Sequence, residues 1–438
     1  MRVTRLTITN LRAMQRGEFH LRSGFNLIVG ANGVGKSTVL DALRICMSRI
    51  LPIISDSQAR AISFGVEDIR RELPFMEVEV VFELEGQEFR LARRQWKEPI
   101  AADDKANLER LRREILETER LRDRARNLLR ELDDSQTVED TDVFSPSKAE
   151  LSRTARALAR PPNCVFFSTN RSVVTGKSGG KGKAAGRTAA AYAEALLPRS
   201  WQVKQFADWM QVQRALAAET SEAARHLEVL EAAATRFLPA YDHVRPGKVG
   251  SGLLIDKGGI TLDVTQLSDG ERGVLAMVLD LARRLSQANP GLDDPLRRAE
   301  AIVLIDELDL HLHPSWQRQI VHKLTEVFPG CQFIATTHSP QIIGEVEHDR
   351  IQIIADGQVH SPPRSFGVDS SRVLEEIMEA DPRAHEVQEL LTQLSQEVGK
   401  QRFDSARELL TQLVTRLDEN DPDVTRARTL IDFVEGKE

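Results

Sequence analysis

The chain has 438 residues, enough for two to three packed units, and its 41% hydrophobic and 29% charged residues are typical of a soluble globular protein with solvated helices. The formal net charge of −7 excludes a global electrostatic attraction to nucleic acid, so any such contact needs a local basic patch. The three cysteines are far apart, no apolar run approaches ~18 residues and the N-terminus lacks a signal-peptide core, so we expect a cytoplasmic chain without a membrane segment.

Residues 1–98 are rich in predicted strands. Val3–Ile8 and Glu77–Glu83 alternate apolar and polar residues at period two, and a turn at Glu85–Gln87 leads to a return strand at Glu88–Ala92. The pattern therefore predicts an antiparallel sheet near the start of the chain.

A phosphate-binding motif, GANGVGKST, lies between an apolar strand pattern and a helix pattern. In G-x-x-x-x-G-K-S the glycines let backbone N–H groups converge on a polyphosphate, and the helix dipole points at the same charge. Lys36 is expected to reach the β- and γ-phosphates, and Ser37 to bind Mg²⁺. The expected ATP-binding residues in this stretch are Asn32, Gly33, Gly35, Lys36, Ser37 and Thr38.

Residues 99–162 read as a helical hairpin insertion. Leucines and other apolar residues recur at helical spacing through 103–132, which predicts an amphipathic helix of about 28 residues. We expect Leu151–Ala159 to supply the returning arm, before Pro161-Pro162 ends the insertion.

The next predicted parts are a strand with a loop and then a helical lobe. A buried strand at Cys164–Phe167 and a Gly/Lys-rich, solvated loop make up 163–188. A helical lobe occupies 189–245, with Trp201, Phe206 and Trp209 on its packing face.

Residues 246–365 begin with a predicted hairpin and continue as alternating strands and helices, the pattern of a parallel sheet. Ser268 with Glu271 three residues later forms a capping box, and the same helix N-terminus is suited to a γ-phosphate. The strand AIVLI ends in Asp306-Glu307, where Asp306 would hold Mg²⁺ and Glu307 would deprotonate the attacking water. His338 ends a further strand and is suited to bind the γ-phosphate.

Two other polar patterns have structural explanations. His311 and His313 with His338 suggest a zinc trio, but i, i+2 spacing directs two imidazoles to opposite faces of an extended segment, so we expect no zinc. Asp421-Pro422-Asp423 is a D-x-D that opens a helix, where Asp is an N-cap and Pro takes the first turn.

The order GANGVGKS, LSDGER, VLIDE and TTHSP resembles the Walker A, signature, Walker B and switch-histidine motifs of ABC-type ATPase heads of the SMC/RecF/OLD group. The segment from IDELDLHLHP to TTHSPQII is similar to bacterial AAA-15/AAA-21 type ATPases, which include the ATPase subunits of Septu-type and retron-linked anti-phage systems. The resemblance implies an α/β fold: a mixed sheet around a phosphate-loop helix, with a helical insertion and a helical C-terminal region at 366–438.

The resemblance also assigns site residues. It implies that Lys36, Ser37, Asp306, Glu307 and His338 act in one subunit, while Ser268 and Gly270 complete the site of a second across an ATP-sandwiched dimer. Arg12 matches an arginine near the nucleotide. The Q-loop glutamine is missing, so Asn170 would replace it, with Gln95 as the rival.

The leading hypothesis is an ATP- and Mg²⁺-dependent switch that dimerises and controls a separate effector, an HNH-type nuclease in anti-phage defence. The chain is too short after its last strand for a TOPRIM nuclease domain, so we expect no nuclease of its own. The alternatives are a RecF- or SMC-like repair ATPase acting directly on DNA and the nucleotide subunit of a transporter. The acidic charge and short insertion argue against the first, and the RecF-like N-terminus and HLHP segment argue against the second.

Overall fold

The computed structural model describes the chain apart from a set of excluded positions and forms two compact units, Met1–Gly367 and Val368–Glu438. The excluded residues are 59, 72, 97–140, 159, 170–172, 175–187, 199, 249–251, 379, 382 and 437–438. The helix predicted at 103–132 and nearly all of the Gly/Lys-rich loop therefore lie outside the described residues.

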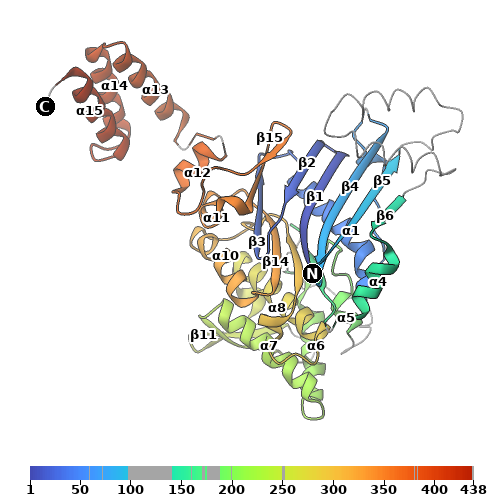
Figure 1. Cartoon of the computed structure of the whole chain (residues 1–438). Coiled ribbons are helices and arrows are strands. Elements are labelled where there is room, and N and C mark those ends of the chain that lie inside the picture. The colour runs from blue at the N-terminus through green and yellow to red at the C-terminus, as the bar shows by residue number, and fades with distance from the viewer. Residues whose placement is uncertain are drawn as a thin grey trace, which may run out of the picture. The chain divides into compact units, whose positions relative to one another are not determined.

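An antiparallel sheet of five strands opens the first unit, in the order β2-β1-β4-β5-β6 (Figure 1). The strands are β1 (Arg2–Leu11), β2 (Met14–His20), β4 (Phe75–Leu84), β5 (Gln87–Trp96) and β6 (Thr141–Ser145). The turn Glu85-Gly86, in which both residues have positive φ, joins β4 to β5 as a tight hairpin. The sheet thus includes the predicted strands and adds β6, which pairs with β5.

A second sheet of six strands carries the phosphate loop, in the order β16-β15-β3-β14-β13-β7. Its strands are β3 (Phe25–Gly30), β7 (Asn163–Phe167), β13 (Ala301–Ile305), β14 (Cys331–Thr336), β15 (Ile351–Ala355) and β16 (Gln358–His360). All neighbouring pairs are parallel except β15 with β16. The carboxyl ends of β3, β13 and β14 therefore meet at one edge, where ligands bind in open α/β sheets.

Helix α1 (Lys36–Ile54) packs between the two sheets. It contacts β1 and β4 of the first sheet and β3, β13 and β14 of the second. Leu40, Leu43 and Met47 are fully buried in the core cluster that joins the helix to both sheets. Because α1 packs against both sheets, its N-terminus has a fixed position at the end of the phosphate loop.

The described residues after β6 include the segment that was expected to form the returning arm of the hairpin. Helix α4 (Lys148–Arg156) begins at Ser147, whose hydroxyl accepts from the Glu150 amide, and it packs against α1. Leu151 is fully buried in the core of the first unit. Within the expected returning arm, Leu151 therefore packs into the core of the first unit, while the helix expected as its partner at 103–132 lies outside the described residues.

The middle of the first unit is largely helical. Its longer helices are α6 (Val203–Leu216), α7 (Ser221–Phe237) and α8 (Asp269–Ala288). The ring of Phe206 packs in a tilted arrangement against Trp201 and Trp209, with ring centroids 5.0 Å and 5.5 Å away, as expected for the packing face. The remaining elements of this part are α5 (Ala189–Tyr192), β8 (Val173–Val174), β9 (Trp201–Gln202), β10 (Tyr241–Pro246), β11 (Leu253–Lys257), β12 (Ile260–Asp263), α9 (Pro295–Arg298), α10 (Pro314–Val327) and α11 (Pro340–Ile343).

The segment 188–196 connects three parts of the first unit through its carbonyl oxygens. The fully buried Arg284 of α8 donates to Ala191 O at 2.6 Å and to Ala193 O at 3.1 Å. Arg44 of α1 donates to Leu196 O at 3.2 Å, and the amide of Phe166 in β7 donates to Ala195 O at 2.8 Å. One short stretch of backbone is therefore tied to α1, α8 and β7.

The second unit is a small helical domain with its own core. Its helices are α12 (Ser370–Glu376), α13 (His385–Gly399), α14 (Phe403–Arg416) and α15 (Pro422–Glu435). Leu394, Ala406 and Leu413 are buried in its apolar cluster. Asp421 caps α15 and Pro422 takes the first turn, which confirms the predicted helix start. The carboxylates of Asp421 and Asp423 both pair with Arg383.

No helix in the described part of the chain is both long enough and apolar enough to cross a membrane.

Candidate functional site

The phosphate loop requires glycine at three positions. A Cβ on Gly30 would lie 2.7 Å from Ile354 O, closer than any real Cβ contact. Gly33 and Gly35 have φ of +83° and +108°, a region that side chains with a Cβ rarely adopt. Gly35 is also the residue from which α1 begins. The loop conformation is therefore fixed by glycines at the predicted spacing.

Lys36 lies back across the loop. Its Nζ donates to Gly30 O and Ala31 O, both at 2.8 Å, and the residue is buried. Burial lowers the pKa of the ammonium, against the opposing effect of nearby carboxylates, of which Asp306 is the strongest. Asn32, Gly33 and Ser37 remain exposed, whereas Thr38 is buried. The ammonium group of Lys36 thus lies against the main chain of the loop, and Asn32, Gly33 and Ser37 form the exposed part of the loop.

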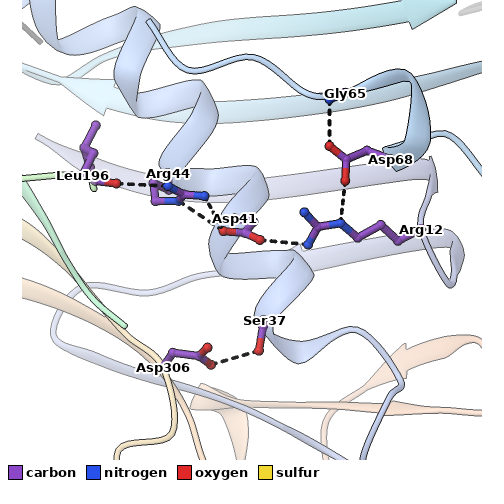
Figure 2. A network of polar contacts seen from close by, with 8 residues as sticks. All are labelled: Arg12, Ser37, Asp41, Arg44, Gly65, Asp68, Leu196 and Asp306. Carbon is purple, nitrogen blue, oxygen red and sulfur yellow. Dashed lines mark hydrogen bonds and ion pairs between the residues drawn. The ribbon is translucent and has the colours of Figure 1, made fainter. Parts of the chain in front are cut away.

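The acidic pair after β13 adjoins the loop. The Ser37 hydroxyl donates to Asp306 Oδ1 at 3.2 Å, as Figure 2 shows, and the amide of Asp306 donates to Phe167 O at 2.8 Å. A hydroxyl and a carboxylate are hard oxygen donors of the kind that Mg²⁺ prefers. Ser37 and Asp306, from segments 269 residues apart, are therefore suited to hold one Mg²⁺ between them.

The strand between β3 and β13 contributes two threonines that sequence reasoning did not single out. Thr336 Oγ1 donates to Asp306 Oδ1 at 2.7 Å and accepts from the Glu307 amide at 2.8 Å. Thr337 Oγ1 donates to Asp309 Oδ1 at 2.5 Å. The only sequence signal for them was a pair of threonines at the end of an apolar strand pattern.

His338 follows these threonines at the same edge of the sheet. It is half-buried, and its amide donates to Asp309 Oδ1 at 3.2 Å. Glu307 is half-buried as well and has a positive φ of 47°. The structure therefore brings Lys36, Ser37, Asp306, Glu307 and His338 to one edge, through the carboxyl ends of β3, β13 and β14.

Ser268 and Glu271 form the predicted capping box at the start of α8. Burial raises the pKa of Glu271, but hydrogen bonds from Tyr241, from Ser268 and from Lys257 outweigh it and hold the pKa at about 2. Tyr241 donates to this carboxylate at 2.5 Å. Ser268 itself is exposed, so its helix N-terminus is open to another molecule.

Gly270 lies against the loop that follows the acidic pair. A Cβ on Gly270 would lie 2.4 Å from the carbonyl oxygen of His311, which has a left-handed φ of 62°. His313 caps α10, accepting from the Ser315 amide at 3.3 Å. The two histidines therefore have local backbone roles in the described structure.

Arg12 lies one helical turn beyond the phosphate loop (Figure 2). Its guanidinium pairs with Asp41 at 2.8 Å and Asp68 at 2.7 Å. Burial lowers its pKa, but hydrogen bonds to these two carboxylates outweigh this and raise the pKa above its usual value. Asp41 also pairs with Arg44 at 2.7 Å. Arg12 thus joins the β1–β2 turn to α1.

The two candidates for the Q-loop differ in position. Asn170 lies outside the described residues, although it follows β7, the neighbour of β13 in the parallel sheet. Gln95 is on β5 of the antiparallel sheet, opposite Met76, and is buried. Of the described residues, Phe167 at the end of β7 adjoins Asp306, whereas Gln95 belongs to the other sheet.

A phosphate-loop helix between two sheets, an acidic pair beside the loop and a histidine just after the intervening strand are the arrangement expected of an ABC-type ATPase head. Residues 25–344, more than half of the chain, match the family described as "AAA domain, putative AbiEii toxin, Type IV TA system". The chain belongs to this family.

Several known proteins resemble parts of the chain. The retron Ec83 probable ATPase of Escherichia coli is 42% identical over 161 residues, which are 36% of this chain and 30% of that protein. The Septu protein PtuA of Bacillus mycoides is 46% identical over 74 residues, 17% of this chain and 10% of that protein. The chain thus matches less than a third of the length of either relative.

Among solved structures, the SMC head domain from Thermotoga maritima has a TM-score of 0.41 at 15% identity, covering 83% of this chain and 99% of that one. The recombination mediator protein RecF has a TM-score of 0.39 at 14% identity, covering 82% and 98%.

Proposed function

We propose that the chain binds and hydrolyses ATP with Mg²⁺, dimerises on ATP and thereby controls a separate effector, an HNH-type nuclease in cytoplasmic anti-phage defence. The ATPase part is supported by the family and by relatives named as ATPases. The observation that carries it is the 3.2 Å contact between Ser37 and Asp306, because it joins the phosphate loop to the acidic pair.

The chemistry follows from the positions of the side chains. Backbone N–H groups of residues 30–38 surround the phosphates, and Lys36 exchanges its two carbonyl partners for the β- and γ-phosphate oxygens. Ser37 and Asp306 would hold Mg²⁺, which would supply positive charge to offset the negative charge of the phosphates. Glu307 accepts a proton from the attacking water, and His338 donates a hydrogen bond to the γ-phosphate.

The dimer part concerns α8. Ser268 is exposed at the N-terminus of a 20-residue helix, where the dipole and free amides suit a phosphate. Ser268 and Gly270 would contact the nucleotide bound to a second subunit, as the resemblance to ABC-type heads implies. The exposure of Ser268 supports this proposal because a residue serving its own subunit's core would be buried.

The effector part concerns the second unit, which the ATPase chemistry does not require. Val368–Glu438 contains 17 of the chain's 66 acidic residues but 9 of its 59 lysines and arginines. Leu430, Phe433 and Val434 of α15 are exposed, and their i, i+3, i+4 spacing places them on one face. An acidic unit with an apolar face is suited to dock a basic protein, and nucleases that bind DNA present basic surfaces.

Two substitutions test the ATPase. Lys36→Ala removes the phosphate contact and is expected to abolish binding of a fluorescent ATP analogue. Glu307→Gln keeps the shape of the site but removes the base, so it should bind the analogue and release no phosphate. Glu326→Gln, on the exposed side of α10, is the matched control and should release phosphate at the wild-type rate. Wild-type turnover by Glu307→Gln would overturn the assignment of the base.

A further inference from the structure

Thr336 occupies the position between the two acidic residues of the site. It is the last residue of β14, it is fully buried, and its hydroxyl lies 2.7 Å from Asp306 Oδ1 and 2.8 Å from the Glu307 amide nitrogen. Its main-chain carbonyl accepts from the Leu308 amide at 2.8 Å. Three consecutive residues after β13 are therefore attached to this one threonine.

The hydroxyl performs two functions that a hydrocarbon cannot. A threonine hydroxyl has one proton to donate and lone pairs to accept with. Here the proton goes to the Asp306 carboxylate and a lone pair receives the Glu307 N–H. Valine has nearly the same shape but would leave the amide without this acceptor and the carboxylate without this donor.

The direction of each bond fits the chemistry of its partner. Asp306 Oδ1 also accepts from Ser37, so the hydroxyls of Ser37 and Thr336 converge on the same oxygen and fix the carboxylate plane. Glu307 has a φ of +47°, which is uncommon for a residue with a side chain. The Thr336 hydroxyl therefore accepts from the amide of a residue whose backbone has an uncommon conformation.

We propose that Thr336 is a positioning residue for ATP hydrolysis: it orients Asp306 toward Ser37 and holds Glu307 in its left-handed conformation. This inference rests on the proposed ATPase function. Thr336 touches neither phosphate nor water in this role, and it acts through the two carboxylates. Its removal should therefore weaken metal use and turnover while leaving metal-free nucleotide binding to the loop intact.

The test compares Thr336→Val with Thr336→Ser. Phosphate release is measured across a range of Mg²⁺ concentrations, and binding of a fluorescent ATP analogue is measured with EDTA. Loss of a hydrogen bond to a charged group should raise the Mg²⁺ concentration for half-maximal turnover about tenfold, with a similar fall in kcat. Thr336→Ser keeps the hydroxyl and should stay within about threefold of wild type.

Thr7→Val, at a buried threonine of β1 in the other sheet, is the control for loss of a buried hydroxyl without loss of the site. Thermal melting of all variants shows whether each has folded. If Thr336→Val does not fold, Thr336→Ala and Thr336→Ser form the comparison, with the same expected order.

Three results would overturn the inference. One is an unchanged Mg²⁺ dependence and kcat in Thr336→Val, and another is equal impairment in the serine variant, which would indicate packing of the methyl group. A wild-type protein that hydrolyses no ATP would overturn the proposed function together with the inference. Turnover by wild type with no effect of Thr336→Val overturns the inference alone.

Discussion

Gly270→Ala and Gly273→Ala place the same methyl group on the same helix in opposite environments. In α8, a Cβ at Gly270 would lie 2.4 Å from His311 O, whereas a Cβ at Gly273 would have no neighbour within 4 Å. Both substitutions gain about 0.5–1 kcal/mol from replacing glycine in a helix. That gain cancels in the comparison, so the difference between the variants measures the cost of the contact at Gly270.

The magnitude follows from the distance. A relaxed contact between nonbonded heavy atoms is about 3.5 Å, so the helix and the His311 backbone must separate by about 1 Å. Overpacking of this kind costs about 1–3 kcal/mol, because neither partner is the free end of a flexible side chain. We therefore expect Gly270→Ala to be less stable than Gly273→Ala by about 1–3 kcal/mol.

Urea titration followed by tryptophan fluorescence measures this difference, since every tryptophan of the chain lies in the first unit. The reporters are Trp96, Trp201, Trp209 and Trp316. Unfolding of both variants at the same urea concentration would refute the close approach of α8 to the His311 backbone. Greater stability of Gly270→Ala would refute it as well.

Three further predictions concern assembly, acid stability and the effector. A mixture of Lys36→Ala and Ser268→Arg chains should recover part of the ATP turnover that each lacks alone, because the heterodimer keeps one intact composite site; a mixture that stays inactive would contradict the shared site. Tyr241→Phe removes a hydrogen-bond donor to Glu271, whose pKa is lowered to about 2 in the folded chain. The ionised carboxylate stabilises the fold above about pH 4.5, and this contribution is lost as the pH falls toward 2, so the variant should have a lower urea midpoint than wild type at pH 7 and an equal one near pH 2. Equal urea midpoints at pH 7 would argue against this role of Tyr241. Purified chain with Mg²⁺ should not cut DNA, and deletion of 370–438 should spare ATP binding but abolish co-purification with the effector; DNA cleavage by the chain alone would refute the switch hypothesis.

The parts of the site that the sequence predicted are those with local causes. Gly30, Gly33 and Gly35 are needed by one short loop, and the strand-then-carboxylate pattern places Asp306 at a strand end whatever the neighbouring strands are. The capping box at Ser268 is likewise contained within four residues. The spacing of residues along the sequence is enough to predict such features, because each of them depends on a single turn or strand end.

The features that were not predicted depend on which strands are neighbours. Thr336 reaches Asp306 because β14 pairs with β13, and that order is a property of the whole sheet. Similarly, β6 is short and lacks a strong strand pattern, and it becomes a strand by pairing with β5, from which residues 97–140 separate it in the sequence. The N-cap role of Asp421 was predictable, but its pairing with Arg383, 38 residues away, was not.

The backbone segment 188–196 links two helices whose N-termini are both candidate phosphate sites. Arg44 ties it to the helix that starts at the phosphate loop, and Arg284 ties it to the helix that starts at Ser268. Hydrogen bonds from a charged guanidinium to main-chain carbonyls are short and directional, so a shift of either helix relative to this segment would have to break or bend them. The start of the phosphate-loop helix and the start of the helix capped by Ser268 are thus connected within one chain through a single short stretch of main chain.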